Sequence, residues 1–193
     1  MSKTLVDVER FYALYLTKER FFMQKISPKT LKVVYCAAFI AIAVLLGGFF
    51  SFYLTEEIKI SLAPIPVMFA GSVLGPVFGG ITGFITDLLS YLLKPMGAYF
   101  PGFSITMALY GILSGLFFYK KPKNSLLKIT LVTFLTQTVC SVFVNTLWLS
   151  IMMGTPYFVL MIGRLPTTYL SFAIYTIILF VLVKNKDKII RNL

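Results

Sequence analysis

Two charged residues lie within long apolar runs of this sequence, and their side chains are the first candidates for binding chemistry. Asp87 comes near the end of one run, and Arg164 lies in the last run of the chain. A charge in the hydrocarbon of a membrane costs several kcal/mol unless it finds water or a partner. We interpret both residues as lining one outward-facing cavity. A structural ion pair between them is the alternative.

A turn rich in aromatic residues follows Asp87. Lys94-Pro95 ends the preceding helix, because proline lacks an N–H and disfavours a helical residue before it. Glycine in the turn permits backbone angles that other residues resist. The turn predicts the rim of a ligand pocket, although an interfacial aromatic belt also fits it. Its candidate binding residues are Tyr99, Phe100, Pro101, Gly102 and Phe103.

Asn145 and Trp148 stand three residues apart in a later apolar run, which places an amide and an indole on one face of a helix. Packing inside a helix bundle explains Trp148 equally well. It explains Asn145 less well, because a buried amide needs hydrogen-bond partners. We therefore include both side chains among the candidate ligand-binding residues.

Catalytic motifs are missing from the sequence. The chain has no histidine, no G-x-x-x-x-G-K-[ST] phosphate loop and no G-x-S-x-G elbow. A metal site or a carboxylate pair would need more acidic residues than Asp87 in the apolar runs. We therefore expect no enzymatic activity, no metal and no cofactor. Any use of ATP would require another chain.

The composition is that of a membrane protein. Of the 193 residues, 58% are hydrophobic and only 13% are charged, against about a quarter charged in a soluble domain. Fifteen of the 18 Lys and Arg residues lie before or within the start of the first run, at 120–128, or from Lys184 onward. This pattern predicts a multi-pass membrane protein with both termini in the cytoplasm, and argues against nucleic acid as a partner.

The apolar runs predict an all-α membrane protein in which six transmembrane helices form a compact bundle. Gly75-Pro76 divides the run 65–93, because glycine can end a helix and proline can open the next. We divide the chain into an amphipathic or partly ordered segment, 1–26, and a transmembrane substrate-binding domain, 27–193. The predicted helices are 29–51, 62–75, 76–93, 103–119, 126–153 and 156–183.

Small residues at four-residue spacing mark helix faces on which another helix can approach closely. Glycine pairs with this spacing predict packing within the chain; they are Gly71/Gly75, Gly79/Gly83 and Gly111/Gly115. Ala37 and Ala41 have the same spacing in the first predicted helix. Spacing alone favours packing of these two alanines within the chain as well.

Taken together, these features resemble a known family, the substrate-binding subunits (S-components) of energy-coupling factor (ECF) vitamin transporters. The resemblance covers about residues 30–183 and rests on the six short helices, the Ala-x-x-x-Ala face and the run from Gly75 to Phe103. The segment 97–103, with the later Asn-Thr-Leu-Trp motif and arginine, resembles the folate-type branch. The leader 1–26 departs from the compact family pattern.

The resemblance implies a subunit that captures a vitamin from outside with high affinity, with folate as the best single candidate. It implies assembly with a transmembrane coupling subunit and two cytoplasmic ATPase subunits, and delivery by toppling in the lipid bilayer of a bacterial plasma membrane. Ala37 and Ala41 match the motif that contacts the coupling subunit. The external loop 53–64 would match the lid of the pocket.

Folate has a flat pterin, an aromatic linker and a glutamate tail, and the candidate residues suit each part. Asp87 or Asn145 suits the pterin edge. Arg164 suits a glutamate carboxylate, which an arginine binds through two parallel hydrogen bonds. The rings that can stack on the ligand are those of Tyr99, Phe103 and Trp148.

Three other functions fit the sequence less well. The same fold could carry another cargo, such as another pterin, thiamine or a deazapurine. A small channel or facilitator would transport without ATP and without partners. A membrane enzyme would turn over its substrate without an obvious catalytic group.

Overall fold

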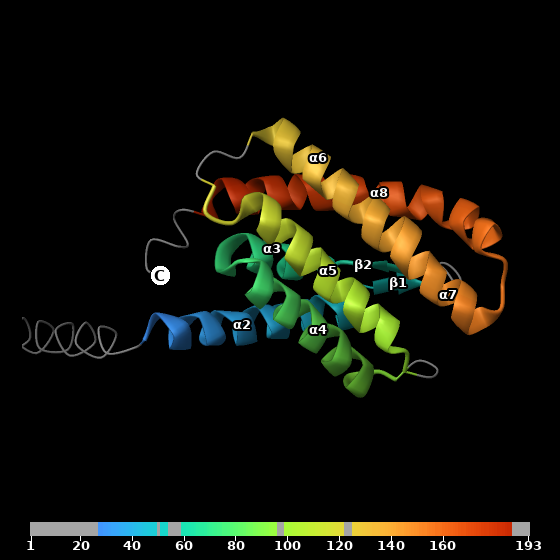
Figure 1. Ribbon diagram of the computed structural model, residues 1–193, viewed down its shortest axis with the longest axis horizontal. Coiled ribbons are helices and arrows are strands. Elements are labelled where there is room, and N and C mark those ends of the chain that lie inside the picture. Colours follow the sequence, from blue (N-terminus) through green and yellow to red (C-terminus); the bar gives the residue numbers. More distant parts are fainter. Residues whose placement is uncertain (1–26, 50, 54–58, 96–98, 122–124, 187–193) are drawn as a thin grey trace, which may run out of the picture.

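The computed structural model describes residues 27–49, 51–53, 59–95, 99–121 and 125–186. Within these residues the chain is helical apart from one short hairpin and the connections (Figure 1). The helices are α2 (Pro28–Phe49), α3 (Pro64–Leu74), α4 (Pro76–Leu93), α5 (Pro101–Phe118), α6 (Leu126–Gln137), η1 (Thr138–Asn145), α7 (Thr146–Met153) and α8 (Tyr157–Lys184). The strands are β1 (Ser51–Tyr53) and β2 (Lys59–Ser61).

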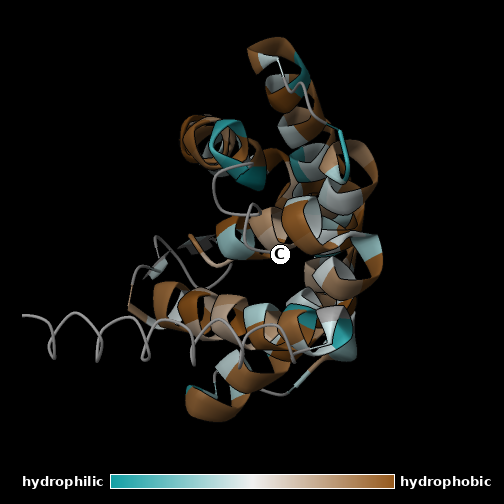
Figure 2. Ribbon diagram, turned by 90° about the vertical axis from the view of Figure 1, so that its left-hand side faces the viewer, coloured by the Kyte–Doolittle hydropathy of each residue, from teal (hydrophilic) through white to brown (hydrophobic). Residues whose placement is uncertain are grey.

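Five helical stretches of the described chain are long and apolar enough to cross a membrane: α2, α4, α5, α8 and the continuous stretch α6–η1–α7. The sixth helix, α3, has only 11 residues, and all of them are buried. Most of the helical ribbon carries the colour of hydrophobic residues (Figure 2). The all-α membrane fold with six helical segments is therefore confirmed. The placement of both termini in the cytoplasm stays a prediction, and the segment 1–26 lies outside the described residues.

The helices form two groups, with α2 to α5 on one side and α6 to α8 on the other (Figure 1). Close packing of α3, α4 and α5 holds the first group together, and glycines make it possible. A side-chain carbon on Gly71 would lie 2.1 Å from the carbonyl oxygen of Gly111, and one on Gly83 would lie 2.2 Å from that of Met107. The predicted close approach is confirmed for five of the six glycines, whereas the sixth, Gly75, faces the ring of Tyr119.

The break between α3 and α4 falls at Gly75-Pro76, as predicted. Gly75 adopts φ 103°, a conformation that residues with a side chain rarely adopt. Pro76 is the first residue of α4, where its missing N–H leaves no helical hydrogen bond unmade. The predicted boundaries of this helix, 76–93, agree with the structure.

The segment that follows α2 differs from the predicted external loop 53–64, because it contains two short strands. Strands β1 and β2 pair antiparallel, with Ser51 opposite Ser61. The hydroxyl of Tyr175 in α8 donates a hydrogen bond to the carbonyl oxygen of Ser61. The hairpin is thereby joined to the second helix group. Residues 54–58 of the expected lid lie outside the described residues.

The predicted helix 126–153 is continuous, but it is not α-helical throughout. The eight residues of η1 form a π-helix, whose turns are wider than those of an α-helix. The Thr146 hydroxyl donates to the carbonyl oxygen of Ser141, five residues earlier, over 3.2 Å. Helix α8 also contains an internal proline, Pro166, whose ring removes one hydrogen bond of the helix. Both irregularities lie close to candidate binding residues.

Candidate functional site

Asp87 and Tyr99 are brought together by a third residue, Ser104. The Ser104 hydroxyl donates to Asp87 Oδ2 over 2.7 Å, and its oxygen lies 2.8 Å from the Tyr99 hydroxyl. Ser104 has one hydrogen to give, so Tyr99 donates to Ser104. The Tyr99 ring also packs on Tyr91, with centroids 5.1 Å apart. A carboxylate at the end of α4 is thus connected by hydrogen bonds to the aromatic turn.

Trp148 lies against the start of α5. Its ring centroid is 5.6 Å from that of Phe100, and Phe100 is 5.8 Å from Phe103. The indole Nε1 donates to Thr106 Oγ1 over 3.1 Å, and Thr106 donates to the carbonyl oxygen of Gly102 over 3.0 Å. Of the predicted aromatic residues, Phe100, Phe103 and Trp148 therefore form one cluster, which joins the start of α5 to α7.

Gly102 is buried at the centre of this aromatic cluster. A side-chain carbon there would lie 2.5 Å from Phe100 Cε1 and 2.6 Å from Trp148 Cδ2, so only glycine fits without displacing both rings. Pro101, the preceding residue, is exposed and occupies the first position of α5. Gly102 therefore has a clear packing role in the predicted pocket wall, whereas Pro101 serves to start the helix.

Arg164 is buried, with 8% of its surface exposed. Its Nη1 has no hydrogen-bond partner among the described residues. The group lies within electrostatic range of Tyr110, and the Tyr110 hydroxyl donates to Gln137 Oε1 over 2.7 Å. The Gln137 amide nitrogen is likewise buried without a partner in the described chain. Two unused donors thus lie in one buried polar cluster.

The structure does not support the predicted alternative of an ion pair between Asp87 and Arg164. In the described chain Asp87 receives a hydrogen bond from Ser104, and Arg164 Nη1 has no partner. A buried guanidinium without an acidic partner in the described chain is costly, because a charge removed from water needs compensation. Arg164 is therefore available to a bound anion.

The aromatic cluster and the Arg164 cluster share one face of α5. Gly102, Thr106 and Tyr110 are all buried and recur every four residues. The helix rises 1.5 Å per residue, so Tyr110 lies about 12 Å along α5 from Gly102. The arrangement places aromatic rings near one end of the helix and unused hydrogen-bond donors deeper along it. An elongated ligand with rings and an acidic group has the matching chemistry.

Asn145 ends the π-helix and is half-buried. Its side chain does not cap the following helix, α7, and the structure records no hydrogen bond from its amide to the described residues. One turn earlier, the hydroxyl of Ser141 lies 3.2 Å from the hydroxyl of Thr168 in α8. The π-helix is therefore held against the helix that carries Arg164, and the Asn145 amide keeps its donors and acceptor for other partners.

Sequence reasoning missed three residues that organise these clusters: Ser104, Thr106 and Gln137. Each is buried, and each holds a predicted residue or its neighbour by a hydrogen bond. Ser and Thr are common in membrane helices, so their presence carried no signal. Gln137 was recognisable, because a glutamine in an apolar run needs partners for its amide.

Ala37 and Ala41 are exposed on α2. The interpretation from spacing alone, that they pack within this chain, is therefore wrong. Their contact with a coupling subunit stays a prediction. No three His, Cys, Asp or Glu side chains gather in the described part of the chain to hold a metal ion.

Comparisons with known proteins agree with this architecture. Residues 31–183 match the family model "ECF transporter, substrate-specific component". The folate transporter FolT of Clostridium novyi (strain NT) is 32% identical over 157 residues, which cover 81% of this chain and 90% of that protein. A crystal structure of FolT bound with folic acid superposes with a TM-score of 0.72 at 32% identity, covering 79% of this chain and 94% of that one.

The family match extends over most of the chain, and the relative and the solved structure match it over nearly their full length. The matched region contains α3 to α7 and the site at the ends of α4 and α5, together with all of α2 but its first three residues and all of α8 but its last. The chain is a multi-pass membrane protein and belongs to the substrate-specific components of ECF transporters.

Proposed function

We propose that this chain binds folate in the membrane and delivers it to the cell through an ATP-driven coupling module. The observation that carries the proposal is the likeness to FolT with folic acid bound, at 32% identity over 94% of that chain. Members of this family work with a transmembrane coupling subunit and two ATPase subunits, which supply the nucleotide chemistry that this chain lacks.

The buried donors support an acidic, ring-containing cargo. Arg164 has an unused Nη1, and Gln137 has an unused amide nitrogen in the described chain. We assign Arg164 to a glutamate carboxylate of folate, since a bound anion would offset its buried charge. Phe100, Phe103 and Trp148 supply faces on which the ring systems of the ligand can stack.

The pterin edge needs both donors and acceptors. The Asn145 side-chain amide offers both. The Asp87 carboxylate offers acceptors only, and one of its oxygens already accepts a hydrogen bond from Ser104. We assign Asn145 to contact with the pterin. Asp87 we assign either to the pterin or to holding Tyr99 in place, and these two roles differ in whether Tyr99→Phe reproduces the loss caused by Asp87→Asn.

Uptake of labelled folate tests the proposed function against a facilitator. Cells that lack their own folate uptake receive this chain alone, the coupling subunit with both ATPases alone, or all of them together. We expect uptake only with the full set, and none when an ATPase carries a substitution that abolishes ATP hydrolysis. Uptake by this chain alone would favour an ATP-independent channel. Uptake of thiamine or another pterin instead of folate would support the transport function but identify a different substrate.

A further inference from the structure

Two lysines from different helices share one aromatic ring at the end of the bundle that is predicted to be cytoplasmic. Lys32 Nζ in α2 lies 5.9 Å from the ring centroid of Tyr119, directly after α5, and 5.6 Å from that of Phe78 in α4. Lys120 Nζ lies 5.4 Å from the same Tyr119 centroid. The fold thus gathers two positive charges around the point where α2, α4 and α5 meet.

Nothing in the described chain neutralises these charges. Neither lysine has a hydrogen-bond or ion-pair partner there, and the one acidic residue described is Asp87. Asp87 lies nine residues further along α4 than Phe78, about 13 Å along the helix. The aromatic rings attract the two ammonium groups but do not neutralise them. The two positive charges therefore repel each other. An external anion between Lys32 and Lys120 would relieve this repulsion.

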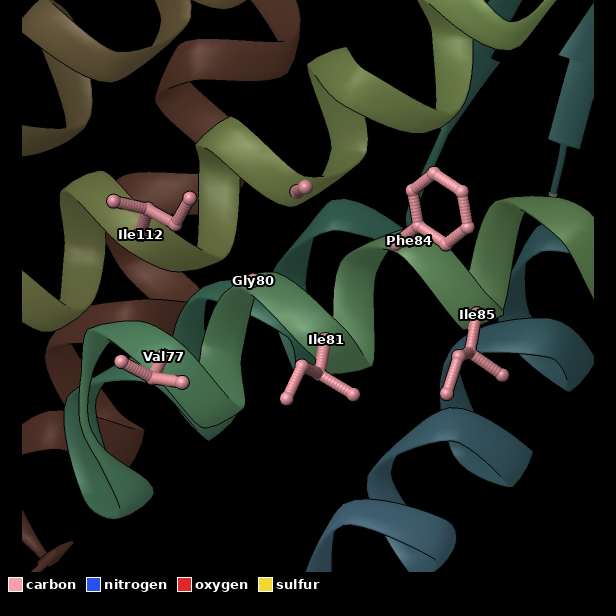
Figure 3. Close-up of a pocket in the computed structure, with 7 residues that line it drawn as sticks. Val77, Gly80, Ile81, Phe84, Ile85 and Ile112 are labelled. Atoms are coloured by element: carbon pink, nitrogen blue, oxygen red, sulfur yellow. The ribbon is translucent and has the colours of Figure 1, made fainter.

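An apolar groove runs between α4 and α5 (Figure 3). Its volume is about 550 Å³. Gly80 and Ala108, with little or no side chain, form its floor, while larger apolar side chains form its walls. The lining residues are Val77, Gly80, Ile81, Phe84, Ile85, Ala108 and Ile112.

The groove lies at the same end of α4 and α5 as the rings that the two lysines cover. Val77 at one end of the groove directly precedes Phe78, whose ring Lys32 covers. Ile112 lies two turns before Tyr119 on α5. One molecule can therefore place an anionic group on the lysines and an apolar chain in the groove. Acidic phospholipids have both parts, and they are concentrated in the cytoplasmic leaflet.

We propose that this surface is a binding site for one acidic phospholipid. Its phosphate lies between Lys32 and Lys120 beside Tyr119, and one acyl chain fills the groove between α4 and α5. In such a site the lipid headgroup would link the N-terminal end of α2 to the adjoining ends of α4 and α5. It would also make the stability of the subunit depend on the lipid composition of the membrane.

Native mass spectrometry of the full chain tests the site. The protein is purified in detergent containing equal amounts of phosphatidylglycerol and phosphatidylcholine, and the lipids that stay bound are counted. We expect one retained phosphatidylglycerol in preference to phosphatidylcholine. Lys32→Gln with Lys120→Gln should lower this preference about tenfold or more, since each lysine near a phosphate contributes to the affinity. Millimolar inorganic phosphate should not displace the lipid.

Two further variants make the test specific. Lys184→Gln is the matched control, because Lys184 is also exposed and lies 5.4 Å from an aromatic centroid, that of Phe180, on a helix outside the groove. It should leave lipid retention unchanged. Ala108→Phe fills the groove and should lower retention of both lipids. Folate binding should persist in all variants, which shows that they are folded.

Three outcomes would overturn the proposal. Equal losses in Lys184→Gln and in the double lysine variant would indicate a general effect of surface charge. Unchanged lipid retention in Ala108→Phe would show that no acyl chain occupies the groove. If Ala108→Phe left lipid retention intact but weakened copurification with the coupling subunit, the groove would belong to that protein contact instead.

Discussion

The indole N–H of Trp148 donates to the Thr106 hydroxyl over 3.1 Å, and this bond joins α7 to α5 at the predicted pocket. The same Thr106 donates to the backbone of Gly102, which lies under the Trp148 ring. The hydrogen bond to Thr106 and the contact with Gly102 therefore fix the orientation of the indole before any ligand arrives. Such preorganisation lowers the entropic cost of binding a flat ring.

Thr106→Val should weaken folate binding about fivefold, because it removes the acceptor and leaves the indole N–H without its partner. A neutral hydrogen bond contributes about 1 kcal/mol, which is roughly that factor in affinity. Isothermal titration in detergent measures the change. Thr133→Val is the matched control, since the Thr133 hydroxyl is buried without a partner in the described chain. Equal affinities of the wild type and Thr106→Val would contradict the role of this bond.

Gly102→Ala should reduce folate affinity tenfold or more. The added methyl group would lie 2.6 Å from Trp148 Cδ2, so the indole must move out of its position. Gly48→Ala serves as the control, because a side-chain carbon at Gly48 in α2 meets no atom within 4 Å. We expect that control to bind folate normally and to melt no lower than the wild type, since alanine favours a helix. A normal Kd in Gly102→Ala would mean that the ring cluster does not shape the pocket.

Arg164→Ala should cost folate binding tenfold or more, because a charge-assisted hydrogen bond contributes about 1.5–3 kcal/mol. The loss should be much smaller for pteroic acid, which lacks the glutamate. Arg164→Lys keeps the charge and should recover part of the folate affinity, though not the two-pronged geometry. If Arg164→Ala lowered the affinity for folate and for pteroic acid equally, Arg164 would contact the pteroyl part of the ligand and not its glutamate.

Ala37→Leu combined with Ala41→Leu should abolish folate uptake and leave folate binding intact. Both alanines are exposed on α2, where larger side chains would keep a partner helix at a distance. Uptake and binding are measured on the same preparations. Ala173→Leu, at an exposed alanine of α8, controls for the added bulk. Normal uptake in the double variant would place the coupling subunit on another face.

Much of the helical framework was predictable because local chemistry determines it. Gly75-Pro76 ends one helix and opens the next, and the predicted bounds of α4 agree with the structure. The glycine faces of α3, α4 and α5 followed from four-residue spacing alone. In lipid the backbone must satisfy its own hydrogen bonds, so a long apolar run leaves few alternatives to a helix.

The π-helix and the hairpin were not predictable in the same way. A π-helix changes the hydrogen-bond register, and a segment that is apolar on most faces shows no periodicity that would report the change. The strands β1 and β2 have three residues each, too few for an alternating pattern. Both features depend on contacts with distant segments, such as the bond from Tyr175 to Ser61.

The candidate site was predicted in its prominent residues but not in its connections. Asp87, Trp148 and Arg164 stand out because charges and indoles are rare in apolar helices. Their partners Ser104, Thr106 and Gln137 do not, because their importance depends on which side chain each one faces. The packing of Phe100 on Trp148 joins segments 48 residues apart, which no local pattern reports.

The central claim, that this chain alone binds folate selectively, is tested most directly by fluorescence. Trp148 is the single tryptophan of the chain and lies in the predicted pocket. Folate is titrated into the purified protein in detergent without ATP, with thiamine and riboflavin as controls. The account predicts saturable quenching by folate at low concentration and no saturable response to the other two vitamins. Saturable binding of thiamine or riboflavin, or no folate binding by calorimetry in a well-folded sample, would contradict it.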